Sequence, residues 1–152
     1  MTKNVKTISN HLFFSWVEDE LVAGNEVRFK VKGISMSPLL RNGKDEVVIE
    51  PCHKDDLKPM DVVLFRYRGG HLLHRIIRRE GEQLWIQGDG SFVAVEQCDV
   101  KDVVGRLCRV YRPSGRKICV NSRQWRWSSR LWRSSDQLRC LFLRIFLFFS
   151  SK

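Results

Sequence analysis

The sequence predicts a mainly β protein, an antiparallel sheet with a short helix before it and an amphipathic helix after it. Between residues 26 and 120, short runs that alternate apolar and polar residues recur, and turns rich in Gly, Pro or Asn separate them. On both sides of this range the apolar residues recur at helical spacing instead. We therefore divide the chain into an N-terminal helix (1–25), a β domain (26–120) and a helical tail (121–152).

The first helix is predicted to begin at Ser9 or Asn10, either of which can cap it, and to stop at Gly24. The strands that follow are predicted at 27–31, 46–50, 61–67, 71–78, 83–87 and 103–111. The glycine pair at 69–70 predicts a hairpin between the third and the fourth of them. A turn at 113–115 then allows residues 117–120 to return as an edge strand.

The positive charge of the chain is concentrated near its C-terminus. The formal net charge is +10, but residues 1–108 contain 16 basic and 16 acidic side chains. Residues 109–152 contain 11 basic side chains and a single acidic one, Asp136. A neutral β domain argues against a nucleic-acid-binding surface there, and a basic block of this kind is typical of an interaction segment.

The tail interleaves arginine and tryptophan and then ends in a run rich in Leu and Phe. Its helical spacing is carried by Arg123, Arg126, Arg130 and Arg133. Charged residues interrupt 131–149, so a membrane-spanning helix is not expected. The composition instead fits a helix that lies among lipid headgroups, which predicts peripheral membrane contact through residues 121–152. Packing of the tail against its own domain or against a partner is the alternative interpretation.

The five cysteines predict neither a disulfide framework nor a metal site. Their number is odd, and no pair of them has metal-ligand spacing. We expect free thiols in a reducing compartment, with no metal and no cofactor. The first residues of the sequence resemble neither a signal peptide nor a spanning segment. A cytoplasmic protein, peripheral on the membrane through its tail, is therefore expected.

A group of short segments carries the functional signal. Residues 33–40, which directly follow the first predicted strand, read Gly-Ile-Ser-Met-Ser-Pro-Leu-Leu. Taken alone, they form an ordinary turn with a capping serine. Three more segments follow in order: Lys-Pro-Met-Asp-Val-Val-Leu-Phe at 58–65, Leu-His-Arg-Ile-Ile at 73–77 and Gly-Asp-Gly-Ser at 88–91. Together with Asp-Val-Val-Gly-Arg at 102–106, they resemble the sequence boxes of type I signal peptidases.

The resemblance implies a serine endopeptidase of the signal-peptidase/LexA-like fold, with Ser35 as the nucleophile and His74 as the general base. Histidine followed by arginine is similar to the archaeal and endoplasmic-reticulum variety, whereas bacterial relatives commonly use lysine. Imidazole titrates near pH ~6.5, so it needs less desolvation than lysine to act as a base near neutrality. The resemblance also implies that Asp89 orients the base, with Glu96 as the alternative.

The same resemblance implies a shallow cleft that binds a peptide or protein substrate as an extended, added strand. Met36 and Gly33, which lie beside the nucleophile in sequence, are the predicted substrate-binding residues. The expected substrate carries a leader or signal-like peptide with small side chains near the cleaved bond.

Two other functional classes remain open. A LexA-like regulator would share the β fold and the serine turn, but such proteins use a lysine base and an N-terminal helix-turn-helix. The residues before Glu26 leave little room for that motif. A non-enzymatic binding protein would use the Arg/Trp tail on a membrane or on nucleic acid, where arginines meet phosphates and tryptophans stack on bases. The neutral β domain disfavours the nucleic-acid form.

Overall fold

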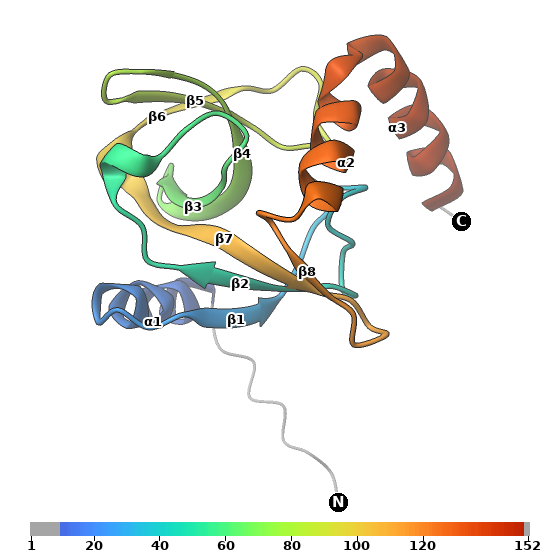
Figure 1. Cartoon of the computed structure of the whole chain (residues 1–152). Coiled ribbons are helices and arrows are strands. Elements are labelled where there is room, and N and C mark those ends of the chain that lie inside the picture. The colour runs from blue at the N-terminus through green and yellow to red at the C-terminus, as the bar shows by residue number, and fades with distance from the viewer. Residues whose placement is uncertain (1–9, 151–152) are drawn as a thin grey trace, which may run out of the picture.

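The structure, a computed structural model, describes residues 10–150 (Figure 1). Residues 1–9, which belong to the predicted N-terminal segment, lie outside the described residues. The helices and strands, in chain order, are α1 (Asn10–Val22), β1 (Val27–Lys30), β2 (Glu46–Glu50), β3 (Val62–Tyr67), β4 (Gly70–Glu80), β5 (Gln83–Gln87), β6 (Glu96–Asp99), β7 (Val103–Tyr111), β8 (Lys117–Cys119), α2 (Arg123–Ser134) and α3 (Asp136–Ser150). The predicted mainly β class, with helices at both ends of the chain, is confirmed.

All the pairings between these strands are antiparallel, and they run in the order β1-β2-β7-β3-β4-β5-β6. β8 pairs with the last residues of β7. The hairpin between β3 and β4 closes through Arg68 and Gly69, whose φ angles of 48° and 76° are both positive. Two positive φ angles in a two-residue loop are the type I′ geometry that suits the twist of paired strands. Among the described strands, β1 and β6 are the two ends of this order.

The sheet curls, so its apolar residues form two cores instead of one (Figure 1). The first core lies between α1, the β1–β2–β7 part of the sheet and α2, and it includes Val17, Leu21, Val47, Leu107 and Trp125. The second lies within the curl of the remaining strands and includes Phe65, Ile76, Leu84, Ile86 and Val103. The alternation of apolar and polar residues in the strands produces both, because every second side chain of a strand points to the same face.

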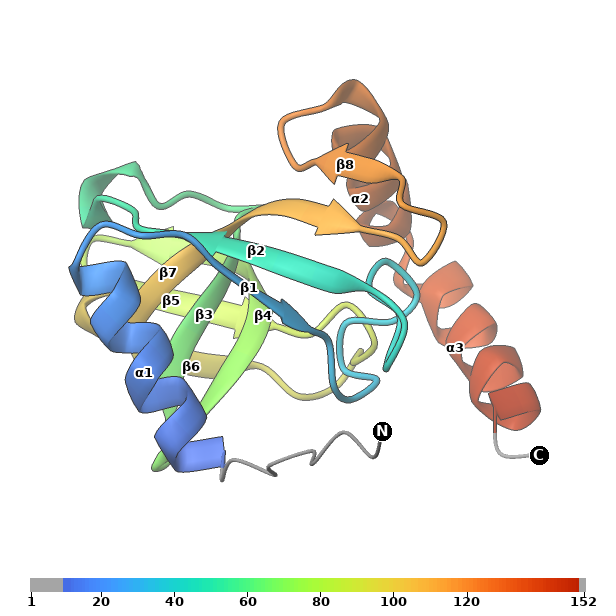
Figure 2. The same ribbon diagram turned by 90° about the horizontal axis from the view of Figure 1, so that it is seen from below.

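Helix α1 covers the sheet beside β1, on the side opposite α2 and α3 (Figure 2). Val17 and Leu21 form its buried face. Gly105 of β7 allows this approach, because a methyl group at that position would lie 3.0 Å from Leu21 Cδ1 and 2.6 Å from Ile49 Cγ2. Burial of a leucine side chain contributes about 2 kcal/mol to folding. α1 is therefore part of the domain's first core.

The tail consists of two helices where the sequence predicted one, because the chain leaves the helical conformation at Ser135. α2 packs on the β domain, and both Trp125 and Ser129 are buried under it. α3 instead leaves a set of large apolar side chains exposed: Leu138, Leu141, Phe142, Ile145, Phe148 and Phe149. Among the described residues, no helix is both long enough and apolar enough to cross a membrane.

Candidate active site

Ser35 lies in an exposed turn that directly continues from β1. Gly33 has a φ of +92°, a conformation that favours glycine, and its N–H donates to Asn42 Oδ1 at 2.9 Å. Within the turn, the Ser37 N–H donates to the carbonyl of Ile34 at 3.0 Å. Because Met36 and Ser37 are buried, the turn is anchored on one side of Ser35 and open on the other.

The Gly-Asp-Gly segment after β5 holds the Ser35 turn at very short range. The Gly90 N–H donates to the carbonyl oxygen of Ser35 at 2.8 Å. A methyl group built on Gly88 would lie 2.4 Å from that oxygen, and one built on Gly90 would lie 2.5 Å from the carbonyl oxygen of Ile34. Neither distance is tolerable for a real side chain, so glycine is required at both positions for the two segments to touch.

His74 lies on the other side of Gly88. A methyl group built on Gly88 would lie 3.2 Å from His74 Nε2, so the imidazole and the Ser35 main chain lie on either side of Gly88. His74 is 5% exposed, and its Nδ1 lies 3.2 Å from Glu96 Oε2. A carboxylate at Nδ1 favours the tautomer that carries its proton there, which leaves Nε2 as an acceptor.

The Nε2 atom of His74 is buried, and it has no hydrogen-bond partner within residues 10–150. A buried imidazole nitrogen without a partner is an uncommon arrangement, since most buried polar atoms are satisfied. The arrangement thus provides a carboxylate at Nδ1, an imidazole whose Nε2 has no hydrogen bond within residues 10–150, and a serine turn whose main chain lies across Gly88 from that nitrogen. Nucleophilic acyl transfer uses these residue types, although no hydrogen bond joins Ser35 Oγ to His74 in the described structure.

The resemblance implies that Asp89 orients His74, but in the structure the Asp89 carboxylate binds Arg75 instead of His74. Asp89 is fully buried, and its two carboxylate oxygens accept from Arg75 Nε and Nη2, each at 2.8 Å. The carboxylate that reaches His74 belongs to Glu96, the alternative from the sequence. His74 and Arg75 are neighbours on a strand, so their side chains point to opposite faces and cannot share one carboxylate.

A groove of about 550 Å³ opens beside the Ser35 turn. Gly33, Ser35 and Met36 line one side of it, and Leu72 and Leu73 of β4 line another. The two predicted substrate-binding residues therefore lie in this groove. Met36 is also a core residue, because it is 3% exposed and its sulfur accepts from the Asp89 N–H at 3.4 Å.

The groove runs past the end of β1, which is hydrogen bonded to β2 alone among the described strands. Lys30, Val31 and Lys32 contribute to its wall. A strand edge with free N–H and C=O groups can accept an extended peptide as a further strand. From α1, Phe13 and Phe14 give the far end of the groove an apolar surface.

No protein-family model and no curated protein matches this chain.

One group of side chains has the proximity that a metal ion requires. The ligand atoms of Glu26, Glu50 and Cys108 all lie within 4.8 Å of one another. Arg109 pairs with Glu26, however, and Arg106 pairs with Glu50. Burial raises the pKa of the Cys108 thiol to about 11, so the thiol is protonated at neutral pH. A metal ion would have to displace two arginines and a proton, which disfavours this group as a metal site.

Proposed function

We propose that this protein is a serine endopeptidase, in which Ser35 is the nucleophile and His74 the general base. The observation that carries the proposal is the buried Nε2 of His74, which has no partner among the described residues and lies beside Gly88, the glycine that the Ser35 turn also contacts. His74 Nε2 takes the hydroxyl proton, and Ser35 Oγ attacks the carbonyl carbon of the scissile bond. The resulting acyl-enzyme is then hydrolysed by water.

Glu96 is the orienting residue in this proposal, because its carboxylate lies at Nδ1 of His74. It stabilises the imidazolium that forms when His74 accepts the proton. Main-chain amides at the Ser35 turn would donate to the oxyanion, since Gly33 has no side chain to contribute. The resemblance of the four sequence segments to type I signal peptidases supports the same assignment and suggests a leader or signal-like peptide as the substrate.

The experiment is co-expression with candidate leader-bearing proteins, followed by intact-mass measurement of both chains. We expect cleavage with the wild type and none with Ser35→Ala or His74→Ala. His53→Ala and Ser128→Ala are matched controls, because both residues are exposed and lie away from the site. Cleavage that persists in Ser35→Ala would rule out the assignment.

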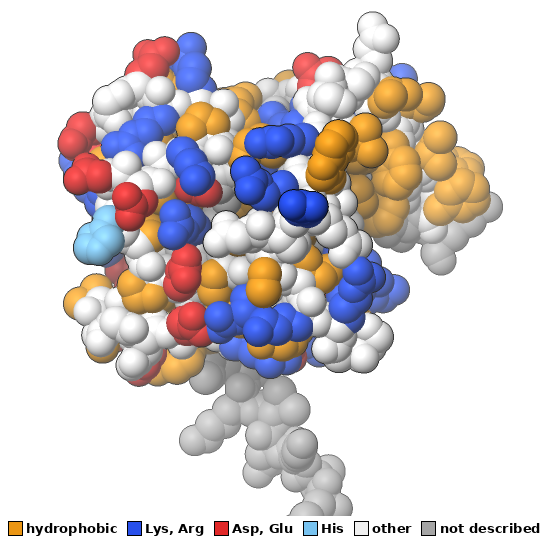
Figure 3. Space-filling view, in the orientation of Figure 1, with side chains coloured by type: hydrophobic (Ala, Val, Ile, Leu, Met, Phe, Trp, Pro, Cys, Tyr) orange, Lys and Arg blue, Asp and Glu red, His pale blue; other side chains and the backbone are white. Residues whose placement is uncertain are grey.

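The exposed apolar face of α3 favours an additional role, peripheral attachment to a membrane on its cytoplasmic side. Figure 3 shows hydrophobic side chains gathered over α3, with Lys and Arg side chains beside them over α2. This combination suits the headgroup region of a bilayer. All five cysteines are free, which is compatible with a reducing compartment.

The attachment is tested by flotation with vesicles that contain anionic lipid. We expect the wild type to float and the variant Leu138→Ser/Leu141→Ser/Ile145→Ser to remain at the bottom. These three side chains are exposed, so the substitutions remove membrane-facing area without opening a core. Equal flotation of the two proteins would contradict the attachment. It would leave α3 as a candidate for protein contacts.

A further inference from the structure

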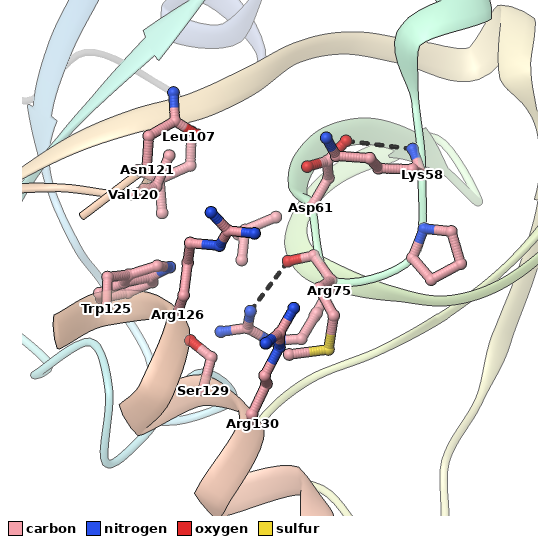
Figure 4. A pocket seen from close by; sticks show the side chains of 13 residues that line it. Lys58, Asp61, Arg75, Leu107, Val120, Asn121, Trp125, Arg126, Ser129 and Arg130 are labelled. Carbon is pink, nitrogen blue, oxygen red and sulfur yellow. Dashed lines mark hydrogen bonds between the residues drawn. The ribbon is translucent and has the colours of Figure 1, made fainter. Parts of the chain in front are cut away.

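A second cavity, of about 350 Å³, lies between α2 and the segment that leads into β3 (Figure 4). It is separate from the groove beside Ser35, and no residue lines both. Its polar lining consists mainly of charged side chains: Lys58, Asp61, Arg75, Arg126 and Arg130. A water molecule occupies about 30 Å³ of liquid volume, so the cavity has room for a small polyatomic ligand.

The charges in this lining do not cancel. Arg75 is neutralised by Asp89, at 2.8 Å. Asp61 lies 3.8 Å from Arg106 Nη1, and its carboxylate also accepts from the main-chain N–H of Lys58. Burial raises the pKa of Asp61, and the nearby charge of Lys58 opposes that shift, so Lys58 and Asp61 interact. The two remaining cations, Arg126 and Arg130, form no salt bridge in the described part of the chain. Two such cations beside one cavity produce a positive local potential.

Ser129 provides an independent indication of a ligand. Its side chain is 1% exposed, and its hydroxyl oxygen has no hydrogen-bond partner within residues 10–150. In Figure 4 that hydroxyl points from α2 toward the space between Arg126 and Arg75. A buried hydroxyl without a partner is costly, and a ligand that accepts from it would remove the cost.

We propose that this cavity binds a phosphate-type oxyanion. Arginine guanidinium groups bind phosphate oxygens through paired N–H donors, while a lysine ammonium adds a compact positive charge. Arg126 and Arg130 are one helical turn apart on α2, so both reach the cavity from the same side. Lys58 lines the cavity from the β domain, and Ser129, between the two arginines in sequence, supplies a hydroxyl donor. The oxyanion is either free in solution or part of a lipid headgroup.

Binding of inorganic phosphate is measured by isothermal titration calorimetry, with sodium chloride at the same ionic strength as the reference. We expect saturable binding to the wild type and at least a roughly tenfold weaker affinity, about 1.4 kcal/mol, for Arg126→Gln/Arg130→Gln. Arg123→Gln/Arg144→Gln is the matched control, because it removes the same charge from the same two-helix tail but does not touch the cavity. The control is expected to bind within about twofold of the wild type.

Equal weakening in the two double variants would overturn the proposal, because it would mean general charge attraction. If the wild type gave no saturable binding signal in the calorimeter, the proposal would be overturned for free phosphate. Circular dichroism confirms that each variant is folded, and glutamine preserves helix propensity at exposed positions.

Vesicle binding separates the two sources. Vesicles of phosphatidylcholine with and without phosphatidic acid are compared, in the presence and absence of inorganic phosphate. Binding that needs phosphatidic acid, falls in Arg126→Gln/Arg130→Gln and competes with phosphate supports a lipid headgroup. Phosphate binding without such vesicle binding supports a free oxyanion. Failure of both arms overturns the proposal, and neither arm depends on peptidase activity.

Discussion

His74 and Arg75 are consecutive residues of β4, and each is bound to a different carboxylate. His74 Nδ1 lies 3.2 Å from Glu96, whereas Arg75 donates two hydrogen bonds of 2.8 Å to Asp89. The imidazole faces the Ser35 turn, and the guanidinium faces α2 and its cavity. One strand therefore contributes to two candidate sites on opposite faces of the sheet, and substitutions of the two carboxylates should have different effects.

Glu96→Gln is expected to lower kcat by on the order of 10²–10⁴-fold, with little change in KM or in the free energy of unfolding. The amide cannot stabilise an imidazolium as a carboxylate does, but it keeps the shape of the side chain. Steady-state kinetics on a cleaved leader peptide measures this effect. Glu82→Gln, at an exposed position, is the control. A kcat equal to that of the wild type would remove Glu96 from the mechanism.

Asp89→Asn is expected to lower the free energy of unfolding by about 3–5 kcal/mol, because it leaves the buried guanidinium of Arg75 without its counter-charge. Urea denaturation followed by fluorescence measures the loss. Asp19→Asn, at an exposed position of α1, should change stability by less than about 0.5 kcal/mol. If the two variants were equally stable, the Arg75–Asp89 pair would not have the structural role assigned to it.

Gly88→Ala is expected to abolish cleavage, because its methyl group would collide with the carbonyl oxygen of Ser35 at 2.4 Å and press on His74 Nε2 at 3.2 Å. The serine turn must then move away from the imidazole. Gly70→Ala is the matched control, since the nearest atom to its methyl group is 3.7 Å away. Intact-mass assays of the two variants under the same conditions make the comparison. Full activity of Gly88→Ala would mean that the turn tolerates displacement.

The ion pair between Glu18 of α1 and Arg66 of β3 should make the free energy of unfolding depend on pH in the acid range. A hydrogen bond from Arg66 lowers the pKa of Glu18 from 4.5 to about 2. A carboxyl whose pKa is lower in the folded state stabilises the fold above its unfolded pKa. That contribution is lost as the pH falls from about 4.5 to about 2. Denaturation curves of the wild type and Glu18→Gln should therefore differ most at neutral pH and converge in acid, and a constant difference would contradict this.

Ser129→Ala is expected to raise the stability of the ligand-free protein by on the order of 1 kcal/mol. The substitution removes a buried hydroxyl that has no partner in the described part of the chain, and it leaves a residue of high helix propensity. Thermal denaturation in a buffer free of phosphate measures the change. Destabilisation by a similar amount would show that the hydroxyl is satisfied within the protein.

Much of the fold could be predicted from the sequence, because strands with one buried face alternate in polarity and glycine marks the turns between them. β6 was not predicted, since Glu96-Gln97-Cys98-Asp99 contains one apolar residue and has no visible alternation. It pairs with β5 across the segment 88–95, and local sequence does not specify that pairing. The break at Ser135 was also missed, because the helical spacing continues on both sides of it.

The candidate site was predicted only in part. Strand alternation places His74 and Ile76 on the same face of β4, and both residues are buried. The sequence could not decide between Asp89 and Glu96, because the answer depends on which carboxylate lies on the Arg75 side of β4. The register of the sheet and the position of β6, which was not predicted, determine this. The same applies to the cavity under α2, because Lys58 and Arg126 are far apart in the sequence and come together only when α2 packs on the domain.

The two ends of the sheet contribute different parts of the proposed catalytic unit: β1 leads into the serine turn, and β6 carries Glu96. β6 has four residues and one neighbouring strand, so local fraying there requires far less free energy than global unfolding. Each such opening would withdraw the carboxylate from His74 while the rest of the domain stayed intact. Amide hydrogen exchange along β6 would then report the fraction of molecules in which the imidazole has lost its support.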